Sequence, residues 1–219
     1  MKIIVPLRAR TWAELEPKLD QITDQVDIVE IWLDQIFMDL MRQPQIIPEV
    51  ARRLQKLKSD HNLEVLAVCK SPQEQGQFGG TEAQRIEILQ AFLQLGGDYV
   101  DVDVRLNHKE LIRQLPLEKT WCSLHDFSGI PENLESLVRD MKTLKPAIYK
   151  FAVTPQGEAE LNNFVEFSQQ FSKQHDAIFT TMGPLGAEGR ERLKDISWGG
   201  FYALNEDEKT ASGQPVLYS

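Results

Sequence analysis

The chain of 219 residues has few cysteines, no long apolar run and no excess of positive charge. Its two cysteines, Cys69 and Cys122, lack the spacing of metal ligands and cannot form the disulfide framework of a small secreted domain. We expect both to be buried free thiols, with a nucleophilic role as the alternative. The net charge of −9 disfavours nucleic acids and anionic membranes as partners, although a local site can still bind a small anion.

The apolar stretches of the chain are short throughout. None approaches the ~18 apolar residues of a membrane-spanning helix, and the apolar core of the first segment, MKIIVPLRAR, is too short for a signal peptide. The chain also lacks a linker, a low-complexity segment and an internal repeat. These features predict a cytoplasmic protein made of a single domain, residues 1–219.

What the chain does contain is a regular alternation of two patterns. Short runs rich in β-branched and aromatic residues alternate with longer stretches whose apolar residues recur at helical spacing. One such stretch, 81–97, begins at a Thr81 cap and ends at Gly96 and Gly97, as helices commonly do. The β-rich runs cover residues 2–7, 27–34, 64–70, 99–105, 121–127, 148–154, 177–182 and 200–205, and the clearest helical stretches cover 11–22, 48–61, 81–97 and 158–174.

This alternation predicts an α/β fold with a parallel sheet and right-handed crossovers. Eight strands with helices between them favour a (β/α)8 TIM barrel. A doubly wound open sheet is the alternative, but no Gly-rich phosphate loop follows a strand. Few residues follow the eighth run, so we expect the last helix of the barrel to be absent or truncated.

The run AIYKFAVTP, residues 147–155, carries a lysine at the centre of an apolar strand. Because strand side chains alternate between two faces, Lys150 shares its face with Ile148 and Ala152, and both faces are otherwise apolar. Buried lysines are rare, since the ammonium group is costly to desolvate. Lys150 is therefore either a side chain that reaches water from an edge strand or a nucleophile poised to attack a carbonyl.

Several other runs carry polar residues on one face and aliphatic residues on the other. In a barrel, polar side chains near the carboxyl ends of different strands converge on one site. We expect Lys150 to point into the same site. The polar residues are Glu30, Trp32 and Asp34; Asp101, Asp103 and Arg105; Ser123 and His125; and Lys70, which closes its strand.

A lysine with a histidine one strand earlier suits Schiff-base chemistry. The amine condenses with a ketone, and the iminium acidifies the adjacent C–H bond. His125 suits the proton transfers, because an unperturbed imidazole titrates near neutrality. The alternative for His125 is a hydrogen-bonded core histidine.

The motifs DIVEIWLD, EQGQFGGTEAQRIEILQAFLQLGGDYVDVDV, SLHDFSGIPENLESLVRDM, IYKFAVTP, TTMGPLGAEGR and ASGQ occur in a distinctive order. In order and spacing, over nearly the whole chain, they resemble the type I 3-dehydroquinate dehydratases. This resemblance implies a (β/α)8 hydro-lyase of the shikimate pathway that converts 3-dehydroquinate to 3-dehydroshikimate. It implies no metal and no organic cofactor, because the lysine supplies the electron sink.

The resemblance also implies residue roles. Lys150 matches the imine-forming lysine, His125 the general acid/base, and Glu74 the acidic residue that orients this histidine. Further matches are substrate-binding residues: Glu30 for hydroxyl groups, Arg190 and Gln214 for the carboxylate, Thr210 where the family places a serine on a lid, and Met182 and Phe201 as apolar lining. We expect the segment NEDEKTASGQP to be that lid, with an ordinary loop as the alternative.

The chain departs from the family pattern at several binding positions. Trp32 and Lys70 stand where arginines are usual, and a lysine keeps the charge but loses bidentate geometry. The motif EQG replaces Glu-Gly-Gly. Most departures affect the grip on the substrate rather than the covalent chemistry.

Three hypotheses follow for the function. The first is an active 3-dehydroquinate dehydratase, whose partner is its small-molecule substrate. The second is a related Schiff-base lyase or aldolase that acts on a different polyol ketone. The third is a non-catalytic ligand-binding homologue. The family often forms dimers, so a homodimer is one expected assembly.

Overall fold

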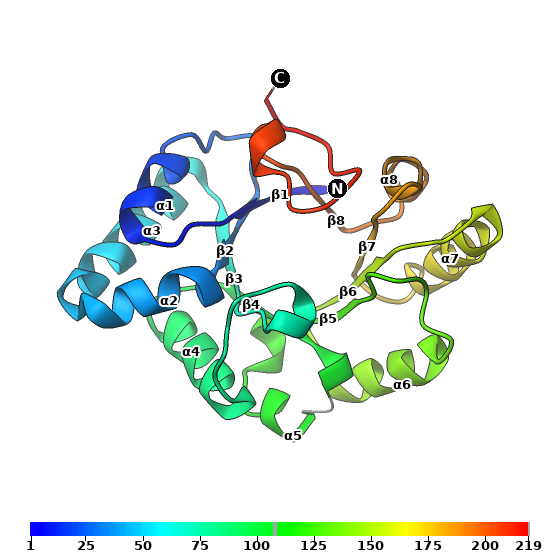
Figure 1. Cartoon of the computed structure of the whole chain (residues 1–219), viewed down its shortest axis with the longest axis horizontal. Helices are drawn as coiled ribbons and strands as arrows, with labels where there is room; N and C mark the ends of the chain where they lie inside the picture. Colours follow the sequence, from blue (N-terminus) through cyan, green and yellow to red (C-terminus); the bar gives the residue numbers. More distant parts are fainter. Residues whose placement is uncertain (107–108, 219) are drawn as a thin grey trace. The chain divides into compact units, whose positions relative to one another are not determined.

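The computed structural model describes residues 1–106 and 109–218 (Figure 1). The chain packs into two compact units. The N-terminal unit is Ile4–Asp101, and the C-terminal unit comprises Met1–Ile3 and Val102–Ser219. Within the described residues, none of the helices combines the length and the apolar character that a membrane crossing requires.

The N-terminal unit contains four parallel strands in sequential order, β1-β2-β3-β4. Helices connect successive strands, and in Figure 1 they lie along one side of them. The Thr81 cap is confirmed, because its hydroxyl accepts a bond from the amide of Gln84 at 3.3 Å. The elements are β1 (Lys2–Leu7), α1 (Trp12–Leu19), β2 (Ile28–Trp32), α2 (Leu33–Arg42), α3 (Ile47–His61), β3 (Glu64–Val68), α4 (Glu82–Gln94) and β4 (Tyr99–Asp103), with 3-10 turns η1 (Pro44–Ile46) and η2 (Pro72–Glu74).

The C-terminal unit begins within β4 and continues the same alternation. Its strands β5, β6 and β7 are parallel neighbours in sequential order, and the amide of Lys2 donates to the carbonyl of Trp198 at 2.9 Å, just before β8. The elements are η3 (Val104–Leu106), α5 (Lys109–Ile112), η4 (Leu117–Lys119), β5 (Thr120–His125), α6 (Leu134–Leu144), β6 (Ile148–Val153), α7 (Glu158–Phe171), β7 (Ala177–Thr181), α8 (Gly186–Leu193), β8 (Gly199–Phe201) and η5 (Glu206–Glu208).

The core of the C-terminal unit packs one face of β6 and β7 against α7. Phe151 and Phe179 stack across the two strands with ring centroids 5.7 Å apart, and Phe171 meets Phe151 edge-on at 5.2 Å. This packing fixes which way each strand faces. Since alternate residues point to opposite faces, Lys150 and Ala152 lie on the other face of β6.

Each of the eight predicted β-rich runs overlaps a strand, so the predicted alternation is confirmed, although β8 (Gly199–Phe201) covers only the start of the eighth run. The edge-strand alternative for Lys150 is wrong, because β6 is bonded to β5 on one side and to β7 on the other. Among the described residues after β8, the only helical element is the 3-10 turn η5, which agrees with the expected truncated end. Both cysteines are buried and free, and burial raises the pKa of Cys69. The prediction of a single domain over 1–219 stays a prediction.

Candidate functional site

Lys150 is the best-defined candidate for covalent chemistry. Its side chain is buried, with 3% of the residue exposed. The ammonium nitrogen lies 4.5 Å from the centroid of the Phe201 ring, so β8 contributes an aromatic wall beside it. In the register of the sheet, Lys150 lies between Ser123 on β5 and Ile178 on β7. This places a primary amine inside an apolar setting, where it can serve as a nucleophile.

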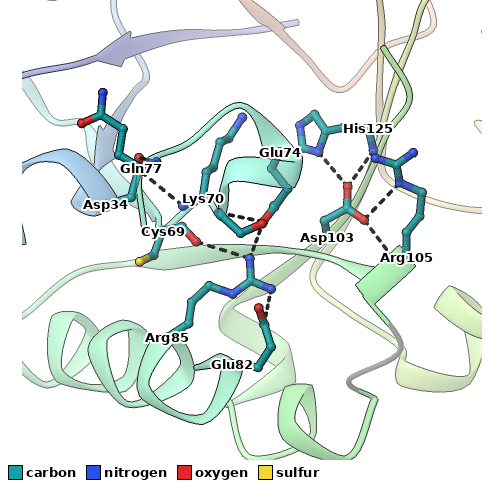
Figure 2. Close-up of polar contacts among 11 residues, drawn as sticks. Asp34, Cys69, Lys70, Glu74, Gln77, Glu82, Arg85, Asp103, Arg105 and His125 are labelled. Carbon is teal, nitrogen blue, oxygen red and sulfur yellow. Dashed lines mark hydrogen bonds and ion pairs between the residues drawn. The ribbon is translucent and has the colours of Figure 1, made fainter. Parts of the chain in front are cut away.

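His125 is the last residue of β5, and its side chain lies on the same face of the sheet as Lys150. Its register partner on β6 is Ala152, two residues beyond Lys150. Nδ1 of the imidazole lies 3.0 Å from Oδ2 of Asp103, and the His125 amide donates to the same oxygen at 2.8 Å (Figure 2). With an ionised Asp103, which only accepts hydrogen bonds, Nδ1 would carry the proton and Nε2 would be the basic nitrogen.

Asp103 is the partner that this geometry assigns to His125. It is the last residue of β4, and its Oδ1 accepts a bond from the Arg105 amide at 2.8 Å. The guanidinium Nε of Arg105 lies 3.6 Å from the same oxygen, so a positive charge stands beside this carboxylate. Sequence reasoning placed Asp103 on the polar face of its strand but did not pair it with His125.

The turn after β5 explains the His-Asp-Phe motif. Oδ1 of Asp126 accepts bonds from the Ser128 and Gly129 amides at 2.9 and 3.1 Å and thereby shapes the turn. The Phe127 ring stacks against the imidazole of His125, with centroids 6.2 Å apart. Asp126 and Phe127 therefore fix the place and the tilt of the histidine.

A cavity with charged and polar lining residues lies in the same unit. It has a volume of about 350 Å³, and its lining includes Arg190, Phe201 and Gln214. Nε of Arg190 donates to the Thr181 carbonyl at 3.0 Å. Among the residues that the structure describes, no acidic side chain forms an ion pair with Arg190, and burial lowers its pKa to about 10. A bound carboxylate would offset the cost of desolvating this half-buried cation.

Gln214 supplies a second polar group to this cavity. Only 1% of the residue is exposed. Its Oε1 accepts bonds from the Thr210 amide at 2.7 Å and from the Thr210 hydroxyl at 3.0 Å, which fixes the orientation of the side-chain amide. Nε2 is then a buried donor with no hydrogen-bond partner in the part of the chain that the structure describes. A carboxylate oxygen is the kind of acceptor that would satisfy it.

A glycine allows this segment to cross the start of α8. Gly213 has φ +80°, and a Cβ on it would lie 2.5 Å from the backbone nitrogen of Ala187. The predicted lid residues Thr210 and Gln214 are therefore brought together with Arg190. Met182 follows β7, is partly exposed and is not part of the lining of this cavity, so its predicted role stays a prediction.

In the N-terminal unit, Trp32 contacts two predicted substrate-binding residues, Glu30 on β2 and Lys70, which lies beyond the end of β3. Its indole N–H donates to Oε1 of Glu30 at 2.9 Å. The ammonium nitrogen of Lys70 lies 4.3 Å from the indole ring centroid, and the guanidinium of Arg8 lies 5.7 Å from it. The family pattern expects an arginine at position 32. Here the indole supplies the hydrogen-bond donor to Glu30, and Lys70 and Arg8 supply positive charge next to the ring.

Glu74 lies in η2 and takes part in a buried ion pair that the sequence did not reveal. Its Oε2 accepts from the Ser71 hydroxyl at 2.9 Å. The same oxygen lies 2.5 Å from a guanidinium nitrogen of Arg85 (Figure 2). Arg85, on α4, also pairs with Glu82. The signal for Arg85 was its position on the apolar face of α4, four residues before Leu89. The role of Glu74 toward the histidine stays a prediction.

The loop that carries Glu74 is held by Asp34. This carboxylate accepts bonds from the amides of Lys70 at 3.2 Å and Gln77 at 2.9 Å, and burial raises its pKa. Gln75 has φ +62°, a left-handed conformation that favours glycine. The substitution of EQG for Glu-Gly-Gly therefore strains this loop locally.

Comparison with solved structures identifies the fold class. The chain is similar to the crystal structure of type I 3-dehydroquinate dehydratase from Clostridium difficile with covalent modified comenic acid, with a TM-score of 0.80 and 23% identity over 99% of this chain and 87% of that chain. Together with the alternating strands and helices, this likeness shows the predicted (β/α)8 barrel class.

The comparison of sequences identifies the family. A family model described as Type I 3-dehydroquinase matches residues 3–215. Curated proteins named 3-dehydroquinate dehydratase from Streptococcus thermophilus and Streptococcus agalactiae are 24% and 26% identical, each over 99% of this chain and 94% of the relative. The chain belongs to the type I 3-dehydroquinase family, a family of hydro-lyases.

Proposed function

We propose that the protein is a 3-dehydroquinate dehydratase that works through an imine on Lys150. The observation that carries the proposal is the pair formed by buried Lys150 and His125, which lie on neighbouring strands, two residues apart in the register and on the same face. Family membership supports the substrate. The relative from Clostridium difficile, which contains covalent modified comenic acid, supports covalent chemistry in this fold.

The reaction begins when the Lys150 amine attacks the ketone carbon and water leaves, which forms an iminium. Nε2 of His125 removes a proton from the adjacent carbon, and the electron pair moves into the iminium to give an enamine. The enamine expels the β-hydroxyl, which takes a proton from the imidazolium and departs as water. Hydrolysis of the remaining iminium releases 3-dehydroshikimate and restores Lys150, so the net change is the loss of one water.

The other groups bind and orient the substrate. Arg190 and the Nε2 donor of Gln214 hold its carboxylate, and Phe201 lines the cavity next to the amine. Asp103 stabilises the imidazolium that forms when His125 takes the proton. The roles that the resemblance gives to Glu30, Lys70 and Glu74 of the N-terminal unit belong to the proposal, as do the shikimate pathway, the cytoplasmic location and a homodimer.

Turnover of 3-dehydroquinate, followed by the absorbance of the enone product, tests this function. Lys150→Ala should abolish turnover, and His125→Ala should slow it by ~10² or more. Lys173→Ala is the matched control, because Lys173 is exposed in the same unit. Turnover that survives in Lys150→Ala, or near-normal turnover in His125→Ala, would remove the assigned role.

A second candidate is a related lyase or aldolase for a different polyol ketone. The observation that favours it is Trp32, whose indole bonds to Glu30 where the family pattern expects an arginine. A panel of polyol ketones separates the two candidates. Faster turnover of another ketone than of 3-dehydroquinate would favour the second.

A further inference from the structure

We propose that the hydroxyl group of Thr180 is a further substrate-binding group, which donates a hydrogen bond to the substrate carboxylate beside Arg190 and Gln214. This inference rests on the proposed function and adds a residue that neither the sequence pattern nor the resemblance assigned. Thr180 lies on β7 and lines the same cavity as Arg190 and Gln214.

The register of three neighbouring strands places Thr180 on the face of Lys150. His125 on β5 pairs with Ala152 on β6, and Ala152 pairs with Thr180 on β7. Two residues before Ala152 on β6, Lys150 pairs with Ser123 on β5 and with Ile178 on β7, and these side chains lie on the same face. Ala152, whose side chain is small, therefore stands between His125 and Thr180 in the register. A substrate bound to the Lys150 amine would have the imidazole on one side and the Thr180 hydroxyl on the other.

The hydroxyl of Thr180 is buried without serving the fold. Only 6% of the residue is exposed, and Oγ1 has no hydrogen-bond partner within residues 1–106 and 109–218. Buried hydroxyl groups are normally bonded, since burial without a partner is costly. The next residue shows the contrast, because Oγ1 of Thr181 donates to the Gly186 carbonyl at 2.9 Å and ties β7 to α8.

Cations outnumber carboxylates in the lining of this cavity, where Arg190, Lys194 and Lys209 stand against Glu191, and this balance favours a carboxylate as the ligand. Arg190 is a half-buried cation with no ion pair to an acidic side chain among the described residues, and Nε2 of Gln214 can only donate. A carboxylate has about four acceptor positions, so it can take bonds from both groups and from the Thr180 hydroxyl. Thr180, Gln214 and Arg190 together would satisfy one anionic group.

The test measures the binding of quinate, the alcohol that corresponds to 3-dehydroquinate and that forms no imine. Thr180→Val keeps the shape and removes the hydroxyl, so it should weaken quinate binding about tenfold, the effect of one hydrogen bond to a charged group. Thr180→Ser should restore the affinity. The melting temperature of Thr180→Val should stay equal or rise, because an unsatisfied polar group is removed.

Thr181→Val is the matched control, and it should lower the melting temperature while quinate affinity changes less than threefold. Unchanged quinate affinity in Thr180→Val would overturn the inference, whatever the melting temperature of that variant. So would the absence of quinate binding to the wild-type protein. Turnover of 3-dehydroquinate by the wild type reports separately on the proposed function, so either idea can fail alone.

Discussion

The bond between Asp103 and His125 gives the sharpest prediction about catalysis. Replacing Asp103 by Asn keeps the size of the side chain and removes its charge. Oδ2 of Asp103 now accepts from both Nδ1 and the amide of His125, at 3.0 and 2.8 Å. In the variant, the imidazolium formed during proton abstraction would face a neutral amide. The transition state for this step is therefore less stabilised, while the formation of the imine on Lys150 is unaffected.

The magnitude follows from the kinds of bond involved. A hydrogen bond to a charged group contributes about 1.5–3 kcal/mol and a neutral one about 0.5–1.5 kcal/mol, so Asp103→Asn should lose about 1–1.5 kcal/mol. Because about 1.4 kcal/mol is a tenfold change in rate, kcat should fall about tenfold. Asp103→Ala removes the whole bond and should lower kcat by about ten- to a hundredfold.

Steady-state kinetics and borohydride trapping provide the assay. We expect kcat to fall in Asp103→Asn while KM changes little and the trapped adduct persists. Asp140→Asn, which removes a partly exposed carboxylate of α6 paired with Lys109, is the control for an unspecific loss of charge. A kcat within twofold of the wild type in Asp103→Asn would refute the positioning role.

Glu74 provides the competing assignment for the same histidine. Glu74→Gln breaks the buried pair with Arg85, and removing one partner of a buried pair costs about 3–5 kcal/mol of stability. Its melting temperature must therefore be measured beside its kinetics. A larger loss of kcat in Glu74→Gln than in Asp103→Asn, measured at a temperature at which both variants are folded, would favour the role that the sequence resemblance gave to Glu74.

Three further substitutions test other parts of the account. Trp32→Phe removes the indole donor to Glu30 and should raise KM for 3-dehydroquinate about tenfold, with an unchanged KM as the contrary result. Gln214→Glu removes the buried Nε2 donor and adds a negative charge, so KM should rise more than tenfold; a KM within twofold would contradict the carboxylate site. Burial raises the pKa of Tyr99 to about 12 from 10, so its stabilising contribution is complete below pH 10 and is lost as the pH rises from 10 to 12. In this window the melting temperature of the wild type should fall more steeply than that of Tyr99→Phe, and parallel curves would contradict this.

The strands and the special position of Lys150 could be predicted from the sequence because they rest on local patterns. Alternating polar and aliphatic residues placed Glu30 and Trp32 on one face, and their direct hydrogen bond agrees with this. Alternation also placed Lys150 in an apolar strand, which the burial of that residue confirms.

The partners of the site residues could not be predicted in the same way. The bond from His125 to Asp103 joins residues 22 positions apart, and the bond from Arg85 to Glu74 joins a helix to a loop. Such contacts depend on the register between strands and on how helices pack, which local periodicity does not specify. The unsatisfied hydroxyl of Thr180 is likewise visible only when all neighbouring atoms are placed.

Peptide mapping after borohydride reduction tests the central claim most directly. The wild-type protein is incubated with 3-dehydroquinate and reduced, and the modified residue is located by mass spectrometry of its peptides. The account predicts one substrate adduct, on Lys150, and none in Lys150→Ala. Turnover without any adduct, or an adduct on another lysine that persists in Lys150→Ala, would contradict it.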